Sequence, residues 1–142
     1  MEIDRTVLSS KRLRLSASVL ILAIYVASLM LPAVLKTDTS AAHDAGYPGY
    51  SILMIGWLGV ANLQPAWIAN PLLLLTLAMP TRALGIATAV FAACAIGWRE
   101  IPNDAGVEHV LSYGAGYYLW MLAMALTASL PFVLKAAKQR RS

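Results

Sequence analysis

Long stretches without a charged residue constrain this chain more than any other feature of its sequence. They cover residues 15–35, 45–81, 83–98 and 110–134. A helix needs about 20 apolar residues to cross the roughly 30 Å hydrocarbon core of a bilayer, so each stretch is a candidate span. Charged side chains make up 13% of the chain, whereas soluble domains contain about 25%. The sequence therefore predicts an all-α integral membrane protein.

We expect a single transmembrane domain over residues 1–142 that folds as a four-helix transmembrane bundle. The predicted spans are about residues 16–35, 66–80, 83–98 and 113–134. Residues 50–81 are too long for one span, because a straight helix of that length would extend about 48 Å. Pro65 and the pair Asn70-Pro71 should break it. An extra short interfacial or re-entrant helix, at about residues 50–61, then precedes span two.

The first predicted span has features of a secretory signal peptide as well as of a membrane anchor. Basic residues precede it, and its apolar run over residues 15–35 contains 21 residues. The apolar region of a signal peptide has only about 7–15 residues, so we expect an uncleaved anchor. The alternative is cleavage near Ala41 or Ala42, which would leave three spans.

The basic residues predict the orientation of the chain. With both termini and the Arg82 turn in the cytoplasm, nine of the eleven Lys and Arg residues lie inside, and only Lys36 and Arg99 lie outside. Basic residues favour the cytoplasmic side of a membrane, so we expect cytoplasmic N- and C-termini. The formal charge of +4 comes from residues that flank apolar spans. That arrangement indicates a lipid bilayer as the partner, and no nucleic acid.

Three amide side chains form the best candidate for a ligand site. Asn62, Gln64 and Asn70 cluster around the predicted helix breaks, and Trp57 and Trp67 lie close to them in the sequence. Polar groups at membrane depth need partners, which neighbouring helices or a water-filled cavity can supply. Two interpretations stay open: the amides satisfy freed backbone groups, or they line a notch that binds a ligand.

Small residues recur at every fourth position of the third predicted span, at Gly85, Ala89, Ala93 and Gly97. Such a series lets two helices approach closely in lipid. It predicts helix packing, either inside the protein or between two copies of it.

Candidate metal ligands occur only in the predicted external loops. His43 is followed by Asp44, and His109 is preceded by Glu108. These residue types bind Zn²⁺ if the loops meet, but their spacing matches no metal motif. The single Cys94 lies in an apolar run. The sequence therefore predicts no cofactor and no catalytic residue.

Three segments resemble those of a group of small, uncharacterised bacterial multi-pass inner-membrane proteins. They are residues 49–59, 66–75 and 112–120. The resemblance implies a multi-pass protein of the bacterial inner membrane, and it supplies no catalytic residues.

Packing surfaces predominate in this sequence over reactive groups, so we expect a protein that is not an enzyme. The leading hypothesis is a non-catalytic membrane partner, such as an accessory or immunity-type protein, that contacts another membrane protein or itself. The first alternative is a small transporter or ligand-binding membrane protein that uses the notch at Asn62, Gln64 and Asn70. A membrane enzyme that uses the external His and acidic groups is the third hypothesis.

Overall fold

A computed structural model describes the chain except for residues 1, 36–45, 59–63, 104–105, 111 and 141–142. For residues 2–10, 100–103 and 106–109 it describes the backbone alone. The described chain is mostly helical. Its helices are α1 (Glu2–Met30), α2 (Gly49–Ile55), the 3₁₀ helix η1 (Pro65–Ile68), α4 (Ala69–Ala78), α5 (Arg82–Ala93) and α6 (Ala115–Gln139).

Two of these helices are long and apolar enough to cross a membrane. They are α1, over Lys11–Met30, and α6, over Ala115–Gln139. The apolar helices Pro65–Ala78 and Arg82–Ala93 are shorter. At the rise of regular helices they extend only about 23 Å and 18 Å, less than a hydrocarbon core of about 30 Å. Length thus separates the long helices α1 and α6 from the two shorter apolar helices.

Proline positions explain where several helices begin and end. The first predicted span ends earlier than expected, because α1 stops at Met30 and Pro32 begins a strand. A residue that precedes proline, here Leu31, is disfavoured in helical conformation. Pro65 begins η1, whereas Pro71 does not break a helix. It lies in the first turn of α4, where a missing N–H removes no helical hydrogen bond.

Two small sheets correct the expectation of a purely helical fold. One contains β1 (Pro32–Leu35), β2 (Tyr47–Pro48) and β5 (Ser112–Tyr113) in the order β2-β1-β5. The other is the antiparallel hairpin of β3 (Glu100–Asn103) and β4 (Gly106–His109). In the first sheet Val34 pairs with Tyr47 on one side and Tyr113 on the other. This pairing joins the end of α1 to the start of α6.

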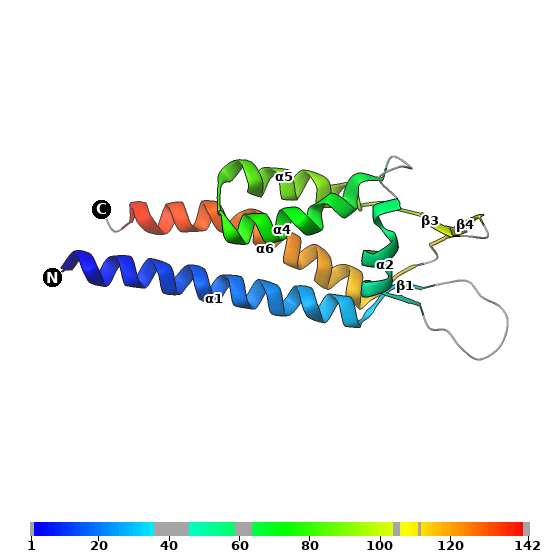
Figure 1. The fold of residues 1–142 in the computed structure, drawn as a ribbon, viewed down its shortest axis with the longest axis horizontal. Helices are drawn as coiled ribbons and strands as arrows, with labels where there is room; N and C mark the ends of the chain where they lie inside the picture. The colour runs from blue at the N-terminus through cyan, green and yellow to red at the C-terminus, as the bar shows by residue number, and fades with distance from the viewer. Residues whose placement is uncertain (1, 36–45, 59–63, 104–105, 111, 141–142) are drawn as a thin grey trace.

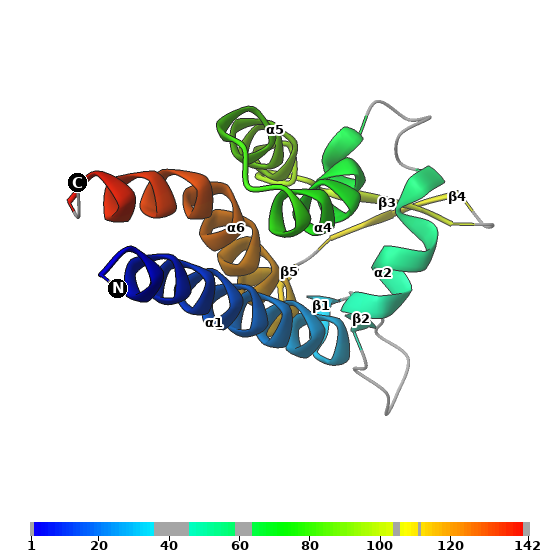
Figure 2. The ribbon, with the colours of Figure 1, turned by 60° about the vertical axis from the view of Figure 1, so that its left-hand side comes forward.

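The two ends of the molecule differ in structure. Both termini lie at one end, and both sheets and α2 lie at the other (Figure 1). The turn between α4 and α5 faces the end that carries the termini (Figure 1). In Figure 2, α6 lies between α1 and the α4–α5 hairpin, and the largest helix interface in the described chain joins α1 to α6.

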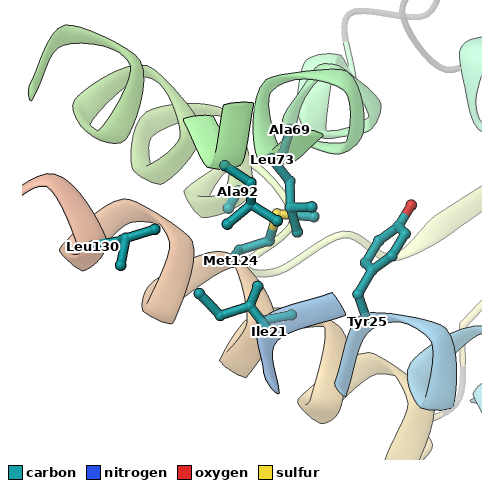
Figure 3. Close-up of a cluster of buried hydrophobic side chains, with 9 residues drawn as sticks. Ile21, Tyr25, Ala69, Leu73, Ala92, Met124 and Leu130 are labelled. Atoms are coloured by element: carbon teal, nitrogen blue, oxygen red, sulfur yellow. The ribbon is translucent and has the colours of Figure 1, made fainter. Parts of the chain in front are cut away.

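The core lies where α1, α4, α5 and α6 meet (Figure 3). Ile21 of α1, Leu73 of α4 and Met124 of α6 are almost completely buried. The outward faces of the same helices are also apolar, with exposed side chains such as Val19 and Val90. Apolar side chains therefore occupy both the inside and the outside of the helical part.

The packing face of α5 differs from the predicted one. Gly85, Thr88 and Ala92 are buried, whereas Ala89 and Ala93 are exposed. A Cβ atom at Gly85 would lie 2.7 Å from the carbonyl oxygen of Ala128 in α6, so this glycine permits close approach of α5 and α6. Ala89 and Ala93 thus lie outside the face that α6 covers, because a strict four-residue spacing turns by about 40° per step in a helix of 3.6 residues per turn. Helix packing through these two alanines stays a prediction.

Gly97 has a conformational role and no packing contact. Its φ angle is +82°, and a Cβ atom placed there would meet nothing within 4 Å. Glycine adopts this left-handed conformation without strain, and such a residue commonly follows a helix. Gly97 thus redirects the chain after α5 toward β3.

Candidate functional site

Asn70 is the centre of a polar cluster that connects three helices. Its side chain is 9% exposed. The Oδ1 atom accepts a hydrogen bond from Tyr25 Oη of α1 at 3.1 Å and another from Trp120 Nε1 of α6 at 2.8 Å. Its Nδ2 atom donates to the carbonyl oxygen of Trp67 at 2.9 Å. One amide therefore holds α1, α4 and α6 together.

The orientation of the Asn70 amide follows from its partners. An indole Nε1 is a donor only, so the atom that faces Trp120 must be the amide oxygen. That oxygen has two lone pairs, and the bonds from Tyr25 and Trp120 occupy both of them. No acceptor capacity of Asn70 remains for a ligand.

Trp67 extends the cluster toward α2. Its Nε1 atom donates to the carbonyl oxygen of Leu53 in α2 at 2.8 Å. A Cβ atom at Gly56 would lie 2.7 Å from Trp67 Cδ1, so the indole ring packs directly against the end of α2. Trp67 is half-buried and fixes the short helix against η1.

The structure brings together only part of the predicted notch. Asn70 and Trp67 share a hydrogen bond, whereas Trp57 is 57% exposed. Gln64 precedes η1 and makes no capping hydrogen bond with its side chain. Asn62 lies outside the described residues. The cluster that forms is thus centred on Asn70 alone, and it draws its other members from α1 and α6.

Tyr25 and Trp120 are the members that sequence reasoning did not find. Tyr25 is the one hydroxylated aromatic residue in the first predicted span, and Trp120 belongs to an aromatic-rich segment that resembles an interfacial belt. Both lie at least 45 residues from Asn70 in the sequence. Their side chains carry donors that need an acceptor when buried, but nothing in the sequence identifies Asn70 as that acceptor.

Hydroxyl groups form a second polar contact, between α4 and α5. Thr76 and Thr88 are fully buried, and their Oγ1 atoms lie 3.1 Å apart. Each hydroxyl also lies within hydrogen-bond distance of a carbonyl four residues earlier in its own helix. The two hydroxyl groups have two protons for these three contacts, so one proton is shared between two acceptors. Within the described residues, every buried side-chain nitrogen or oxygen has a partner.

The described bonds give the Asn70 cluster a structural role. Asn, Tyr and Trp side chains are uncharged near neutral pH, and in this cluster they bond to one another and to the backbone. The described residues contain no group of three His, Cys, Asp or Glu side chains that could hold a metal ion. His43 and the side chain of His109 lie outside the described residues, so the predicted loop metal site is not tested.

No protein-family model matches the chain, and comparison with curated proteins and with solved structures finds no match.

Proposed function

We propose that the chain is a four-span protein of the bacterial inner membrane that acts as a non-catalytic partner of another membrane protein or of itself. The observation that carries the proposal is the distribution of polar and apolar groups. Buried polar side chains of the described helices bond within the chain, and their outward faces are apolar. A surface of that kind suits contacts with lipid and protein.

Matching helix levels support the four-span arrangement. Arg14 bonds the last carbonyl groups of α4, and Arg82 begins α5, so these elements share one level at the basic end. From Arg14 to Pro32 the chain rises about 27 Å, and from Ala115 to Lys135 about 30 Å. Both distances approach the thickness of a hydrocarbon core. In this arrangement the short pair crosses with help from its flanking turns.

The contacts of α1 support the uncleaved anchor. Ile21, Tyr25 and Ser28 of α1 are buried against the rest of the protein. Removal of this helix would expose the core and deprive Asn70 of one donor. Cleavage of this helix would remove these contacts from the mature protein.

The outward face of α5 is the proposed contact face. Ala89 and Ala93 are exposed there, between the larger exposed side chains of Ile86 and Val90. Small residues on a lipid-exposed helix allow a second helix to approach closely. The ligand-binding alternative receives less support, because the oxygen of Asn70 is fully engaged by Tyr25 and Trp120.

The single cysteine provides a direct test of this face. Cys94 is exposed near Ala93, so mild oxidation of native membranes should produce a Cys94-linked dimer if α5 pairs with itself. The Cys94→Ala variant is the control. Photocrosslinking from Val90, with buried Thr88 as the matched position, should capture a different membrane protein if the partner is not a second copy. The transporter alternative would be favoured if neither experiment captured a partner and the protein carried a solute into vesicles. In that case a folded Asn70→Ala variant should lose the uptake.

Impermeant thiol labelling tests the orientation. Cysteines introduced within residues 36–48 and 100–108 on a Cys94→Ala background should be labelled from outside intact cells, because nine of eleven basic residues favour the opposite side. External labelling at Ser142 would contradict an even number of spans.

A further inference from the structure

We propose that the basic end of the helices binds the phosphate of an anionic lipid, with Arg14, Arg82 and Lys135 as its cationic ligands. This inference rests on the membrane location proposed above and adds a specific lipid class to it. The site lies around the turn between α4 and α5, where α1 and α6 both contribute a basic residue.

Arg14 is fixed at this turn by the backbone of α4. Its Nη2 atom donates to the carbonyl oxygens of Leu77 and Ala78 at 3.0 Å and 2.5 Å. A guanidinium group has five N–H donors, and these two bonds use only the Nη2 group. The Nε and Nη1 donors of a half-buried, positioned arginine are left for another acceptor. Phosphate oxygens match this fork geometry.

Arg82 and Lys135 bring positive charge to the other side of the turn. Arg82 follows Ala78 by four residues and begins α5, and its guanidinium carbon lies 5.6 Å from the centre of the Phe132 ring. Lys135 is exposed and follows Phe132 by three residues on α6. Residues three apart on a helix are neighbours on one face. Phe132 therefore contacts Arg82 through its ring and shares a helix face with Lys135.

Among the side chains that the structure describes, no acid lies at this end. No Asp or Glu occurs in residues 11–35, 64–99 or 110–140. The nearest acid on the same helix is Asp4, ten residues before Arg14, which is about 15 Å along the axis. Exposed charges are largely screened beyond about 8 Å at physiological salt. The described side chains therefore supply no counter-charge to these cations, and an anion from outside the chain can supply it.

The surroundings favour a lipid over a free phosphate ion. Met79, Phe132 and Val133 are exposed apolar residues beside the cations, with exposed fractions of 53%, 41% and 53%. A free anion gains nothing from them, whereas the acyl chains of a phospholipid would cover them. Cationic side chains above apolar ones match the two parts of an anionic phospholipid, and basic pockets between membrane helices bind such headgroups.

The test is a lipid titration of the purified full-length protein in detergent, read by native mass spectrometry. Phosphatidylglycerol should bind at least tenfold more tightly than phosphatidylcholine. The double variant Arg82→Gln, Lys135→Gln should lose about 25-fold in phosphatidylglycerol affinity, because each cation near an anionic surface contributes about 1 kcal/mol, or about fivefold. Arg99→Gln, which removes one positive charge at the other end, should bind as the wild type does.

Two further arms separate charge from folding and lipid from free phosphate. The charge-conserving variant Arg82→Lys, Lys135→Arg should keep most of the affinity, with unchanged helical content by circular dichroism. Equal phosphatidylglycerol binding by the Gln double variant and Arg99→Gln would overturn the proposal, as would inorganic phosphate that binds as tightly as the lipid. Release of the protein from membranes by alkaline carbonate would refute the membrane location itself, whereas an embedded protein without lipid preference would refute only this site.

Discussion

The Asn70 cluster and the basic end differ in where their polar groups find partners. At Asn70, neutral donors and acceptors from α1, α4 and α6 satisfy one another inside the protein. At the basic end, Arg14 bonds backbone carbonyls and Arg82 lies over a ring face, and residues 11–35, 64–99 and 110–140 contain no acid. The first region is closed and the second is open to outside groups.

The difference follows from the energetic cost of each group. An unsatisfied neutral group away from water costs about 1–3 kcal/mol, which one well-placed partner removes. A charge at the centre of a bilayer costs more, so charges are placed at the boundary, where lipid headgroups and water solvate them. We therefore expect substitutions at Asn70 to affect stability and substitutions at the basic end to affect lipid contacts.

Asn70→Ala should have the largest effect on stability, about 3 kcal/mol. The substitution leaves Tyr25 Oη and Trp120 Nε1 without their acceptor, and each unpaired donor costs about 1–3 kcal/mol. The measurement is the free energy of unfolding in mixed micelles. Leu74→Ala, at an exposed position of the same helix, should change it far less. Equal losses for the two variants would show that the Asn70 bonds contribute nothing specific.

Gly85→Leu should lower stability by about 2 kcal/mol, because even a Cβ atom would lie 2.7 Å from the Ala128 carbonyl oxygen. Ala89→Leu should cost less than about 0.5 kcal/mol, since this residue is exposed on the same helix. Thermal melts in detergent compare the two variants. A reversed order would return Ala89 to the internal face that the sequence pattern predicts.

Arg14→Gln should cost about 1 kcal/mol, because α4 would lose a cation at its C-terminal carbonyls. Arg12→Gln is the matched control, since Arg12 is exposed on the same helix turn. Chemical unfolding of both variants tests whether Arg14 stabilises the hairpin. Identical midpoints would indicate that Arg14 contributes only charge.

Tyr25→Phe should have the smallest effect, about 0.6 kcal/mol, the average for a hydrogen bond between membrane helices. Trp120 still occupies one lone pair of Asn70 in this variant. The measurement is again the free energy of unfolding in mixed micelles. A loss as large as that of Asn70→Ala would show that the Tyr25 bond accounts for all of the stability that the cluster contributes.

The long helices were predictable because their signals are local. The segment from Glu2 to Leu31 contains no Pro or Gly, which lets α1 run beyond the apolar stretch that first defined it. Residues 16–35 and 113–134 correspond to α1 and α6 with shifted ends. The strands were not predictable, because segments of two to four residues carry no usable periodicity.

The site could be predicted only at its centre. Asn70 is a rare polar residue in an apolar run, so the sequence marks it as needing partners. Its partners Tyr25 and Trp120 lie 45 and 50 residues away, and no local pattern connects them. The face of α5 that packs inside the protein could not be predicted for a related reason. Small residues occur on both sides of that helix, and spacing alone does not select the side that α6 covers.

The pairing of β1 with β5 sets an order of assembly during synthesis. Leu35 pairs with Ser112, 77 residues later in the chain. At about 5–20 residues per second, a ribosome needs roughly 4–15 s to make the intervening segment. During that interval α1 has neither β5 nor α6 beside it, although the α1–α6 interface becomes the largest between the described helices. The first helix to be made must therefore wait for the last one before its main contact surface can form.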